Sequence, residues 1–267
     1  MIALQRHRNI LSQVIDQGSV RVSTLARRLE VTEETIRRDL RTLSEQGMLA
    51  RTHGGAVALD RGDMHLDLPY DQRHATNPRQ KQAIAHAAAQ LIRPGMVVAL
   101  DPSTTACQLA RLIPDQPLTV VTNSLVICTT LAHRKQIDVI CTGGNLDPEA
   151  MAFFGLHAQR ALERLNVEHL FFSCRGLDLD RGLSEANDRH AAIKLSMLEA
   201  AHRSTLLADT SKLGLASTIF YADVDAADQI IVNRPDTQPE AEAVARLRDR
   251  GIEVHEAPPL PPGDVSS

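Results

Sequence analysis

Two neighbouring arginines, Arg37 and Arg38, follow Thr35 in the segment VTEETIRRDLRTL. Guanidinium groups bind phosphates and the major-groove edge of guanine, and a threonine hydroxyl can bond a base or a phosphate. The simpler interpretation is a solvated helix face on which the arginines pair with Glu33 and Glu34 at i,i+3 or i,i+4. The arginines alone do not distinguish nucleic-acid binding from such a face.

The elements around these side chains follow from the spacing of apolar residues. Ile2–Ile15 predicts a first helix, and Ser23 can cap a second. Thr32 can cap a third helix after a turn of only three or four residues. The segments MLAR and AVAL flank a THGG turn and predict a hairpin. Three helices and such a wing predict a winged helix-turn-helix, which places its second motif helix in the major groove of DNA.

The charge of the chain is unevenly distributed. Residues 1–57 contain nine arginines against six acidic residues, whereas residues 58–267 contain 20 Lys and Arg against 27 acidic residues. A basic segment that also has the winged pattern favours a DNA-binding module over a solvated face.

The segment VSTLARRLEVTEETIRRDLRTLSEQGMLARTHGGAV resembles the signature of the DeoR family of bacterial transcriptional regulators, most commonly repressors. The resemblance implies that Thr35, Arg37 and Arg38 meet DNA and that Arg51 and His53 lie near the wing contacts with the DNA backbone. The predicted DNA-binding residues are Ser23, Thr32, Glu33, Glu34, Thr35, Arg37, Arg38, Arg51 and His53.

Beyond this module the chain alternates short apolar segments with helical ones, which predicts an α/β fold with a mostly parallel sheet. The predicted strands cover residues 96–101, 118–122, 137–142, 167–173, 204–209, 229–232 and 252–255. The predicted helices between them cover residues 104–112, 124–133, 155–165, 185–202 and 238–250. The predicted domains are a DNA-binding domain (1–57), a linker (58–79), an α/β domain (80–257) and a disordered tail (258–267).

Several predicted strands end in residues that could bind an anionic ligand. Asp101 closes the first strand, and Thr104 opens the following helix, where free N–H groups attract anions. Thr122-Asn123 and Gly143-Gly144 occupy the next two strand ends, and Lys212 follows a later one. Each feature also has an ordinary explanation as a helix cap, a turn or a surface lysine.

The motifs DPSTT, VTNS, TGGNL, GLSEAN and DTSKLG occur in the order found in the DeoR-type sensor domain, so the resemblance spans nearly the whole chain. It implies a fold like ribose-5-phosphate isomerase that binds a phosphorylated sugar or related metabolite. The predicted effector-binding residues are Asp101, Ser103, Thr104, Thr105, Thr122, Asn123, Gly143, Gly144, Arg175, Glu185 and Lys212.

Two residues depart from the family pattern. Ser103 occupies a position that is usually glycine, and its Cβ would cost about 1 kcal/mol if the backbone there needs a positive φ. Arg175 stands in SCRG, where smaller residues are common, and either adds a cation to the ligand site or points to solvent.

The apolar runs, the N-terminus and the cysteines exclude several classes of protein. No apolar run has the length of a membrane span, and the N-terminus has arginines where a signal peptide is apolar, so we expect a cytoplasmic protein. The four cysteines lack ligand spacing, which predicts buried thiols and neither zinc nor disulfides.

We expect no metal, no cofactor and no catalysis. The expected partners are an operator duplex, a phosphorylated sugar and further copies of the chain, in a dimer or tetramer. The alternatives are an isomerase-like enzyme with an added DNA-binding module and a non-sensing oligomerisation scaffold.

Overall fold

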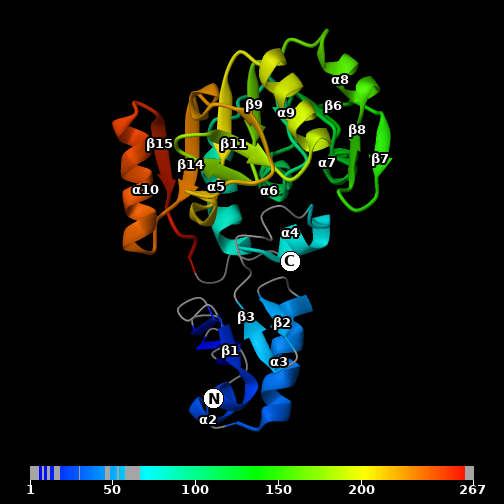
Figure 1. Cartoon of the computed structure of the whole chain (residues 1–267). Helices are drawn as coiled ribbons and strands as arrows, with labels where there is room; N and C mark the ends of the chain where they lie inside the picture. The colour runs from blue at the N-terminus through cyan, green and yellow to red at the C-terminus, as the bar shows by residue number, and fades with distance from the viewer. Residues whose placement is uncertain are drawn as a thin grey trace. The chain divides into compact units, whose positions relative to one another are not determined.

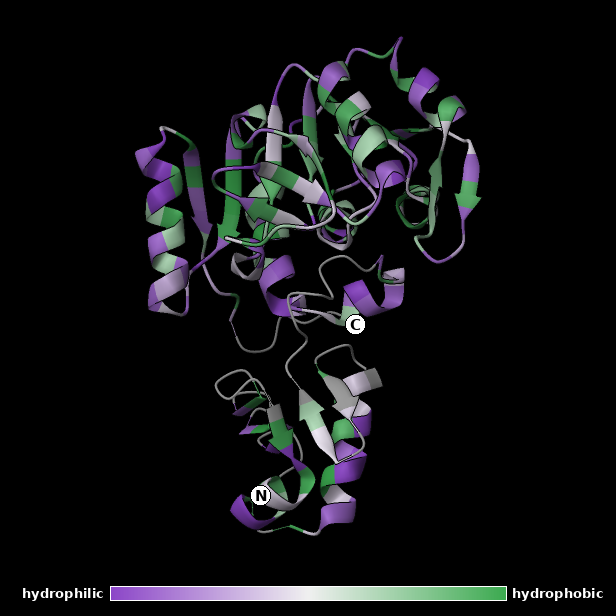
Figure 2. Ribbon diagram, viewed as in Figure 1, coloured by the Kyte–Doolittle hydropathy of each residue, from purple (hydrophilic) through white to green (hydrophobic). Residues whose placement is uncertain are grey.

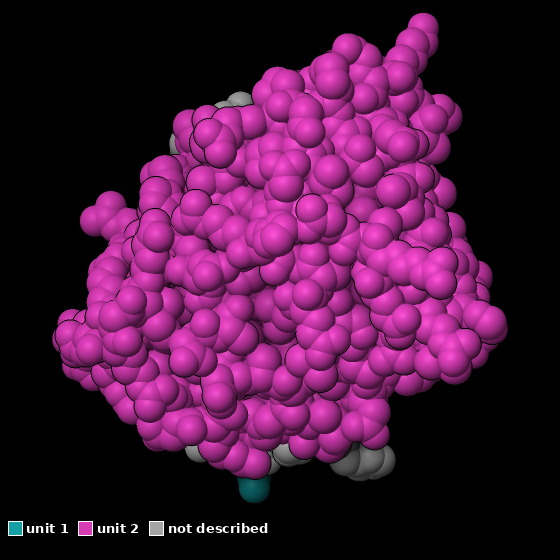
Figure 3. Space-filling view, turned by 90° about the horizontal axis from the view of Figure 1, so that it is seen from above, with its two compact units in different colours: residues 1–76 teal, residues 77–267 magenta. Residues whose placement is uncertain are grey.

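The computed structural model describes residues 6, 7, 9, 10, 13, 14, 19–29, 31–45, 49–52, 54–57 and 67–261. Contacts between Cα atoms divide the chain into two compact units, residues 1–76 and 77–267 (Figures 1 and 3). Within the described residues, no helix is both long and apolar enough to cross a lipid bilayer.

The first unit is a small helical domain with a short antiparallel sheet. Its elements are β1 (Ser19–Arg21), α2 (Val22–Arg28), α3 (Glu33–Glu45), β2 (Ala50–Thr52), β3 (Gly55–Val57) and α4 (Tyr70–Ala75). The sheet has the strand order β1-β3-β2, so the predicted wing gains a strand from the extended segment before α2. The core joins Ile10 and Val14 of the first helical segment to Leu25 of α2 and Leu40 of α3.

The second unit is built on a parallel sheet. The seven described strands of this sheet are β4 (Val97–Leu100), β5 (Leu118–Thr122), β6 (Ile137–Cys141), β9 (His169–Phe172), β12 (Ser204–Leu207), β14 (Gln229–Asn233) and β15 (Glu253–Ala257). Their spatial order is β15-β14-β12-β9-β4-β5-β6, and every pair is parallel. The α/β fold with a parallel sheet is therefore confirmed.

Helices cover both faces of this sheet (Figure 1). They are α5 (Pro78–Ala89), α6 (Thr104–Leu112), α7 (Leu125–Leu131), α8 (Leu156–Leu162), α9 (Asp188–Ala200) and α10 (Gln238–Asp249), with 3-10 turns η2 (Thr210–Lys212) and η3 (Val224–Ala226). On one face α5 packs against α6, and α6 against α7. On the other face α8 packs against α9, and α10 covers β15.

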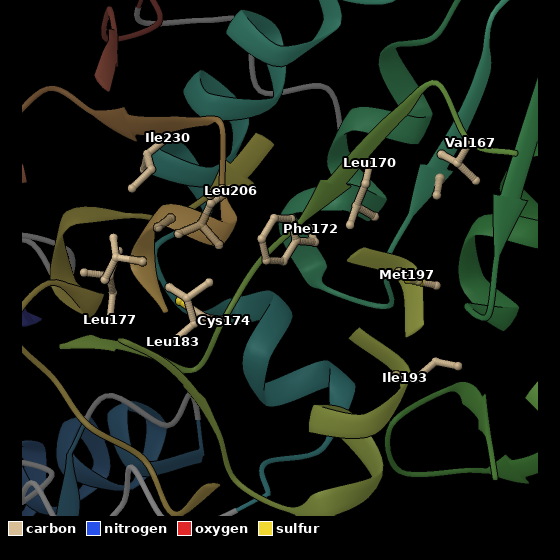
Figure 4. Close-up of a cluster of buried hydrophobic side chains, with 14 of the residues drawn as sticks. Val167, Leu170, Phe172, Cys174, Leu177, Leu183, Ile193, Met197, Leu206 and Ile230 are labelled. Atoms are coloured by element: carbon tan, nitrogen blue, oxygen red, sulfur yellow. The ribbon is translucent and has the colours of Figure 1, made fainter. Parts of the chain in front are cut away.

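The inner strands of the sheet carry mostly hydrophobic residues (Figure 2), and successive side chains of a strand point to opposite faces of the sheet. Leu170 and Phe172 of β9 belong to the same buried cluster as Ile193 and Met197 of α9 (Figure 4). Phe171, between them in sequence, is buried outside this cluster. The inner strands of the sheet are thus buried on both sides, whereas the edge strands β6 and β15 keep exposed residues.

The sequence did not predict the short antiparallel strands around this sheet. They are β7 (Asn145–Asp147), β8 (Ala152–Phe154), β10 (Gly176–Asp178), β11 (Gly182–Glu185) and β13 (Ile219–Ala222). Three or four residues are too few to show an alternating pattern. One consequence is that the helix predicted to begin at residue 185 begins at Asp188, because Glu185 ends β11.

The expectation of buried cysteines is partly wrong. Cys107 and Cys174 are buried, but Cys128 is only half-buried and Cys141 is exposed. Cys141 ends β6, an edge strand of the described sheet.

Candidate DNA-reading helix and effector site

Helix α3 presents most of the predicted arc of polar side chains to solvent, and only Thr35 of this arc is half-buried. Ile36 and Leu40 are almost completely buried, while Arg37 and Arg38 are exposed. Helix α3 is the second helix of a helix-turn-helix with a wing. In such motifs the N-terminal half of this helix reads the major groove.

The first turn of α3 is fixed by Thr32. The Thr32 Oγ1 atom accepts a hydrogen bond from the Thr35 backbone N–H at 3.2 Å, which is the geometry of an N-cap. The Arg37 guanidinium lies 2.9 Å from Glu33, four residues earlier on the exposed face. The simpler interpretation, an ion pair along the helix, therefore holds for Arg37 in the DNA-free chain, and such an exposed pair costs little to break.

Three other predicted residues differ from the expectation or lie outside what is described. Ser23 does not cap α2, because this helix begins at Val22 with Arg21 at the cap position, and Ser23 is an exposed residue inside it. Arg51 lies in β2 opposite Ala56, and only its backbone is described. His53 lies outside the described residues.

Gly55 explains the Gly-Gly pair of the wing. A Cβ atom at Gly55 would lie 1.8 Å from the carbonyl oxygen of Val20 in β1. None of the described atoms lies within 4 Å of a Cβ atom at Gly54, whose carbonyl accepts the backbone N–H of Val22 at 2.9 Å. The second glycine is therefore needed for the close approach of β1 and β3.

Sequence reasoning missed a buried charge on the inner side of α3. Asp39 is 3% exposed, and its carboxylate accepts hydrogen bonds from Arg6 Nε at 2.5 Å and Arg6 Nη2 at 3.0 Å. His7 Nε2 lies 3.0 Å from the same carboxylate. Burial acts to raise the pKa of Asp39, but the hydrogen bonds from Arg6 and His7 outweigh it and lower this pKa.

In the second unit, a cluster of buried charges lies at the carboxyl end of the sheet. Asp101, directly after β4, is fully buried and accepts a hydrogen bond from the Lys194 ammonium. Lys194 also lies 3.3 Å from Glu185. Burial opposes ionisation of both members of the Asp101–Lys194 pair, yet their mutual attraction lowers the pKa of Asp101 and raises that of Lys194. Both groups are therefore charged at neutral pH.

Ser173, directly after β9, connects this cluster to a second lysine. Its backbone N–H donates to Asp101 at 3.0 Å, and its carbonyl accepts from Lys194 Nζ at 2.5 Å. Its hydroxyl accepts from Lys212 Nζ at 2.7 Å. Lys212 lies 4.0 Å from Asp209 and has 18% of its side chain exposed, whereas Lys194 has 3%. Of these two lysines, Lys212 is thus the more accessible to solvent.

Ser103 is not strained, so the expected cost at this position is wrong. Its φ is −73°, in the extended region that any residue adopts. Its hydroxyl accepts the Ala106 N–H at 3.1 Å as the N-cap of α6, and its own N–H donates to Asp101 at 3.1 Å. A serine fits this loop because the hydroxyl completes the helix cap.

The next strand end contributes residues with two different roles. The Thr122 hydroxyl donates to the Leu100 carbonyl at 2.7 Å and accepts the Ser124 N–H at 3.0 Å, so it joins β4 to β5. Asn123 donates to the Phe153 carbonyl at 2.9 Å. In the described part of the chain, Asn123 Oδ1 and Thr105 Oγ1 are buried without a hydrogen-bond partner, which suits groups that await a ligand or water.

The two glycines after β6 have a structural reason. Gly143 and Gly144 adopt φ of +64° and +113°. A Cβ atom at Gly144 would lie 2.6 Å from the Phe154 carbonyl, whereas none of the described atoms lies within 4 Å of one at Gly143. Gly144 therefore lets the loop approach β8, which also binds Asn123.

The remaining predicted residues lie along the same edge. Thr104 is buried in the first turn of α6, and Glu185 ends β11 beside Lys194. Arg175 is half-buried, and its backbone N–H donates to the Ser184 carbonyl at 2.9 Å. Ser173, Lys194 and Asp209, which the sequence analysis did not single out, lie in contact with the predicted residues Asp101 and Lys212. One signal in the sequence could have revealed Lys194, since it interrupts the apolar stripe of α9.

A cavity of about 440 Å³ lies elsewhere, between α5, β14, β15 and residues 258–260. None of the predicted effector residues lines it. Among the described residues, no cluster of three or more His, Cys, Asp or Glu side chains could hold a metal ion.

Comparison with known proteins identifies the family. Residues 6–61 match the DeoR-like helix-turn-helix domain, and residues 76–234 match the DeoR C terminal sensor domain. The uncharacterized HTH-type transcriptional regulator YulB of Bacillus subtilis (strain 168) is 36% identical over 258 residues, 97% of this chain and 98% of that protein. The L-fucose operon activator of Haemophilus influenzae is 38% identical over 225 residues, 84% and 90% of the two chains.

Other similarities are more distant. The HTH-type transcriptional repressor CsqR of Escherichia coli (strain K12) is 30% identical over 250 residues, 93% of this chain and 94% of that protein. Ribose 5-phosphate isomerase A of Methanocaldococcus jannaschii is 17% identical, with a TM-score of 0.39 over 51% of this chain and 55% of that chain, a likeness too low to carry an argument. The two domain matches and the near full-length relatives place this chain in the DeoR family of transcriptional regulators.

Proposed function

We propose that this chain is a transcriptional repressor of carbohydrate-metabolism genes whose binding to operator DNA is controlled by a phosphorylated sugar or related anionic metabolite. The observation that carries the proposal is one chain with an exposed, arginine-bearing α3 in its first unit and a charged cluster at the carboxyl edge of the sheet in its second. In this proposal the protein works in the cytoplasm, as a dimer or tetramer whose paired modules read two half-sites.

For the DNA contacts, Thr35, Arg37 and Arg38 are the side chains that we assign to base edges or phosphates. Arg38 is exposed, and Arg37 has only the exposed Glu33 as its ion-pair partner in the described residues. Thr32 and Glu34 flank the same turn, and Ser23 is exposed on α2. Arg51 and His53 are assigned to the wing by the family resemblance alone.

For the effector, Lys212 is the residue that we assign to the phosphate. Lys194 is buried between Asp101 and Glu185, whereas Lys212, which lies 4.0 Å from Asp209, keeps 18% of its side chain exposed and is the more accessible of the two lysines. Thr105 and Asn123 supply buried oxygens that have no hydrogen-bond partner among the described residues, which suit the hydroxyl groups of a sugar.

One experiment separates this proposal from the two alternatives. The purified chain is heated with a panel of sugar phosphates, the matching free sugars and inorganic phosphate, and each mixture is also assayed for isomerisation by NMR. A ligand present at 100 times its dissociation constant stabilises the chain by about 2.7 kcal/mol. Stabilisation without turnover supports the sensor, turnover supports an isomerase-like enzyme, and no response to any compound supports a scaffold.

The direction of regulation needs a separate measurement, because the relatives include both an activator and a repressor. A duplex selected by the chain from a random-sequence library serves as the DNA probe. We expect the compound that stabilises the chain in the melting experiment to weaken its binding to this duplex. Tighter binding in its presence would contradict effector-released repression.

A further inference from the structure

Asp39 occupies an unexpected place in α3. It follows Arg38 directly in the run that the DNA-binding proposal rests on, yet it is 3% exposed and lies on the inner side with Ile36, Leu40 and Leu43. A buried carboxylate is costly unless hydrogen-bonded cations compensate its charge. Its partner therefore has a defined place in the fold.

That partner comes from the first helical segment, 33 positions earlier. Arg6 binds both carboxylate oxygens, Nε to Oδ2 at 2.5 Å and Nη2 to Oδ1 at 3.0 Å, and His7 Nε2 lies 3.0 Å from Oδ1. The Arg6 and Asp39 side chains are 8% and 5% exposed. Two parallel bonds between planar groups fix distance and direction together, whereas neighbouring apolar contacts can repack.

We propose that the Arg6–Asp39 pair is a positioning contact, which fixes the rotation of α3 about its axis so that Thr35 and Arg38 face the DNA. The inference rests on the proposed function, because it assumes that α3 reads the duplex. Arg38 is the residue before Asp39, and Thr35 lies about one helical turn before it, so a fixed Asp39 sets the direction of both.

The required accuracy explains why a directional contact matters here. Side-chain atoms lie about 5–6 Å from a helix axis, so a rotation of roughly 20° moves them by about 2 Å. Hydrogen bonds to base edges tolerate only a few tenths of an ångström. A small rotation of α3 would thus break its contacts with bases without unfolding the domain.

Stability and DNA binding can be separated, since a buried ion pair often contributes little to stability compared with apolar residues of similar volume. Arg6→Met combined with Asp39→Leu removes both charges of the pair together, and the His7 side chain, which loses its contact with Asp39, is 20% exposed and can bond to water. Arg6→Lys is the conservative variant, which keeps the charge but loses the bidentate geometry. The control is Arg248→Gln combined with Glu256→Gln, which removes an ion pair of 2.9 Å in the second unit.

The probe is a duplex that the parent chain selects from a random-sequence library, and affinity is measured by fluorescence anisotropy against this duplex and a scrambled one. Hydrogen exchange of residues 33–45 reports whether α3 remains folded. For the double variant Arg6→Met, Asp39→Leu we expect at least tenfold weaker binding to the selected duplex and a smaller change in affinity for the scrambled duplex. We expect the protection of α3 against hydrogen exchange to be unchanged. We expect Arg6→Lys to lose about threefold to fivefold and the control to bind like the parent.

The inference is overturned if the double variant binds the selected duplex within twofold of the parent. If the double variant loses the protection of α3 against hydrogen exchange, the Arg6→Lys variant becomes the test. The inference is then overturned if Arg6→Lys keeps α3 protected and binds the selected duplex with the affinity of the parent. If the parent itself selects no duplex, the proposed function fails instead.

Discussion

Lys194 and Asp101 form an ion pair that is sealed from solvent at the carboxyl end of the sheet. Asp101 is 0% exposed and the side chain of Lys194 is 3% exposed. Lys194 reaches the pair from α9, 93 positions after Asp101, and also binds the Ser173 carbonyl. The pair therefore holds α9 against the ends of β4 and β9.

Lys194→Met is expected to destabilise the second unit strongly. The substitution leaves Asp101 buried without its cation, and breaking one side of a buried pair costs about 3–5 kcal/mol. The free energy of unfolding, measured in urea, tests this, with Lys135→Met at an exposed lysine as the control. Equal stability of the two variants would show that the pair does not support the fold.

Lys212→Ala is expected to abolish the effector response while leaving DNA binding intact. Lys212 is the accessible cation beside Ser173, and it lies in the second unit, away in sequence from α3. The measurement compares the ligand-induced rise in melting temperature and the affinity for the selected duplex, again with Lys135→Ala as the control. An unchanged rise in melting temperature would remove Lys212 from the effector site.

Arg38→Ala is expected to weaken operator binding without changing the response to the effector. If Arg38 contacts a phosphate, the slope of log affinity against log salt concentration falls by about one unit. If it contacts a base, binding becomes less selective instead. Arg37→Ala is tested in the same way, and Arg164→Ala, exposed in the second unit, is the control. Normal binding by both α3 variants would refute the assignment of this helix.

Gly144→Ala is expected to destabilise the chain more than Gly143→Ala. Both backbones have positive φ, which costs an alanine about 1 kcal/mol, but only the Cβ at position 144 would collide with the Phe154 carbonyl. Urea unfolding compares the two variants, and the ligand-induced stabilisation shows whether either glycine also contacts the effector. A larger loss of stability at position 143 would contradict this account.

We expect the buried His169 to make the folded chain less stable as the pH falls from 6.5 to about 4. Burial, with a contribution from the charge of Arg203, lowers the pKa of His169 from 6.5 to about 4. In this pH range the unfolded chain binds a proton that the folded chain does not, so stability falls with falling pH, by up to about 3 kcal/mol. His169→Gln should flatten this dependence, whereas His202→Gln, at an exposed histidine, should not. Identical pH profiles for His169→Gln and the parent would exclude this role.

The sequence predicted the fold well where the signal is local. All seven predicted parallel strands are present, because buried apolar runs separated by helical periods are visible within short windows. The exposed arc of α3 was predicted for the same reason, since the 3.6-residue period of a helix places Ile36 on the buried face and Arg37 on the exposed face. The assignment of particular residues to DNA and effector remains a prediction.

By itself, therefore, the sequence determined which segments form helices and strands, and which strand ends and helix face carry polar groups. Tertiary structure alone decided how distant charges are paired. Arg6 meets Asp39, and Lys194 meets Asp101, across 33 and 93 positions. No local period encodes such pairs, because a buried charge is compensated by whichever group the packing of other elements brings within hydrogen-bond distance.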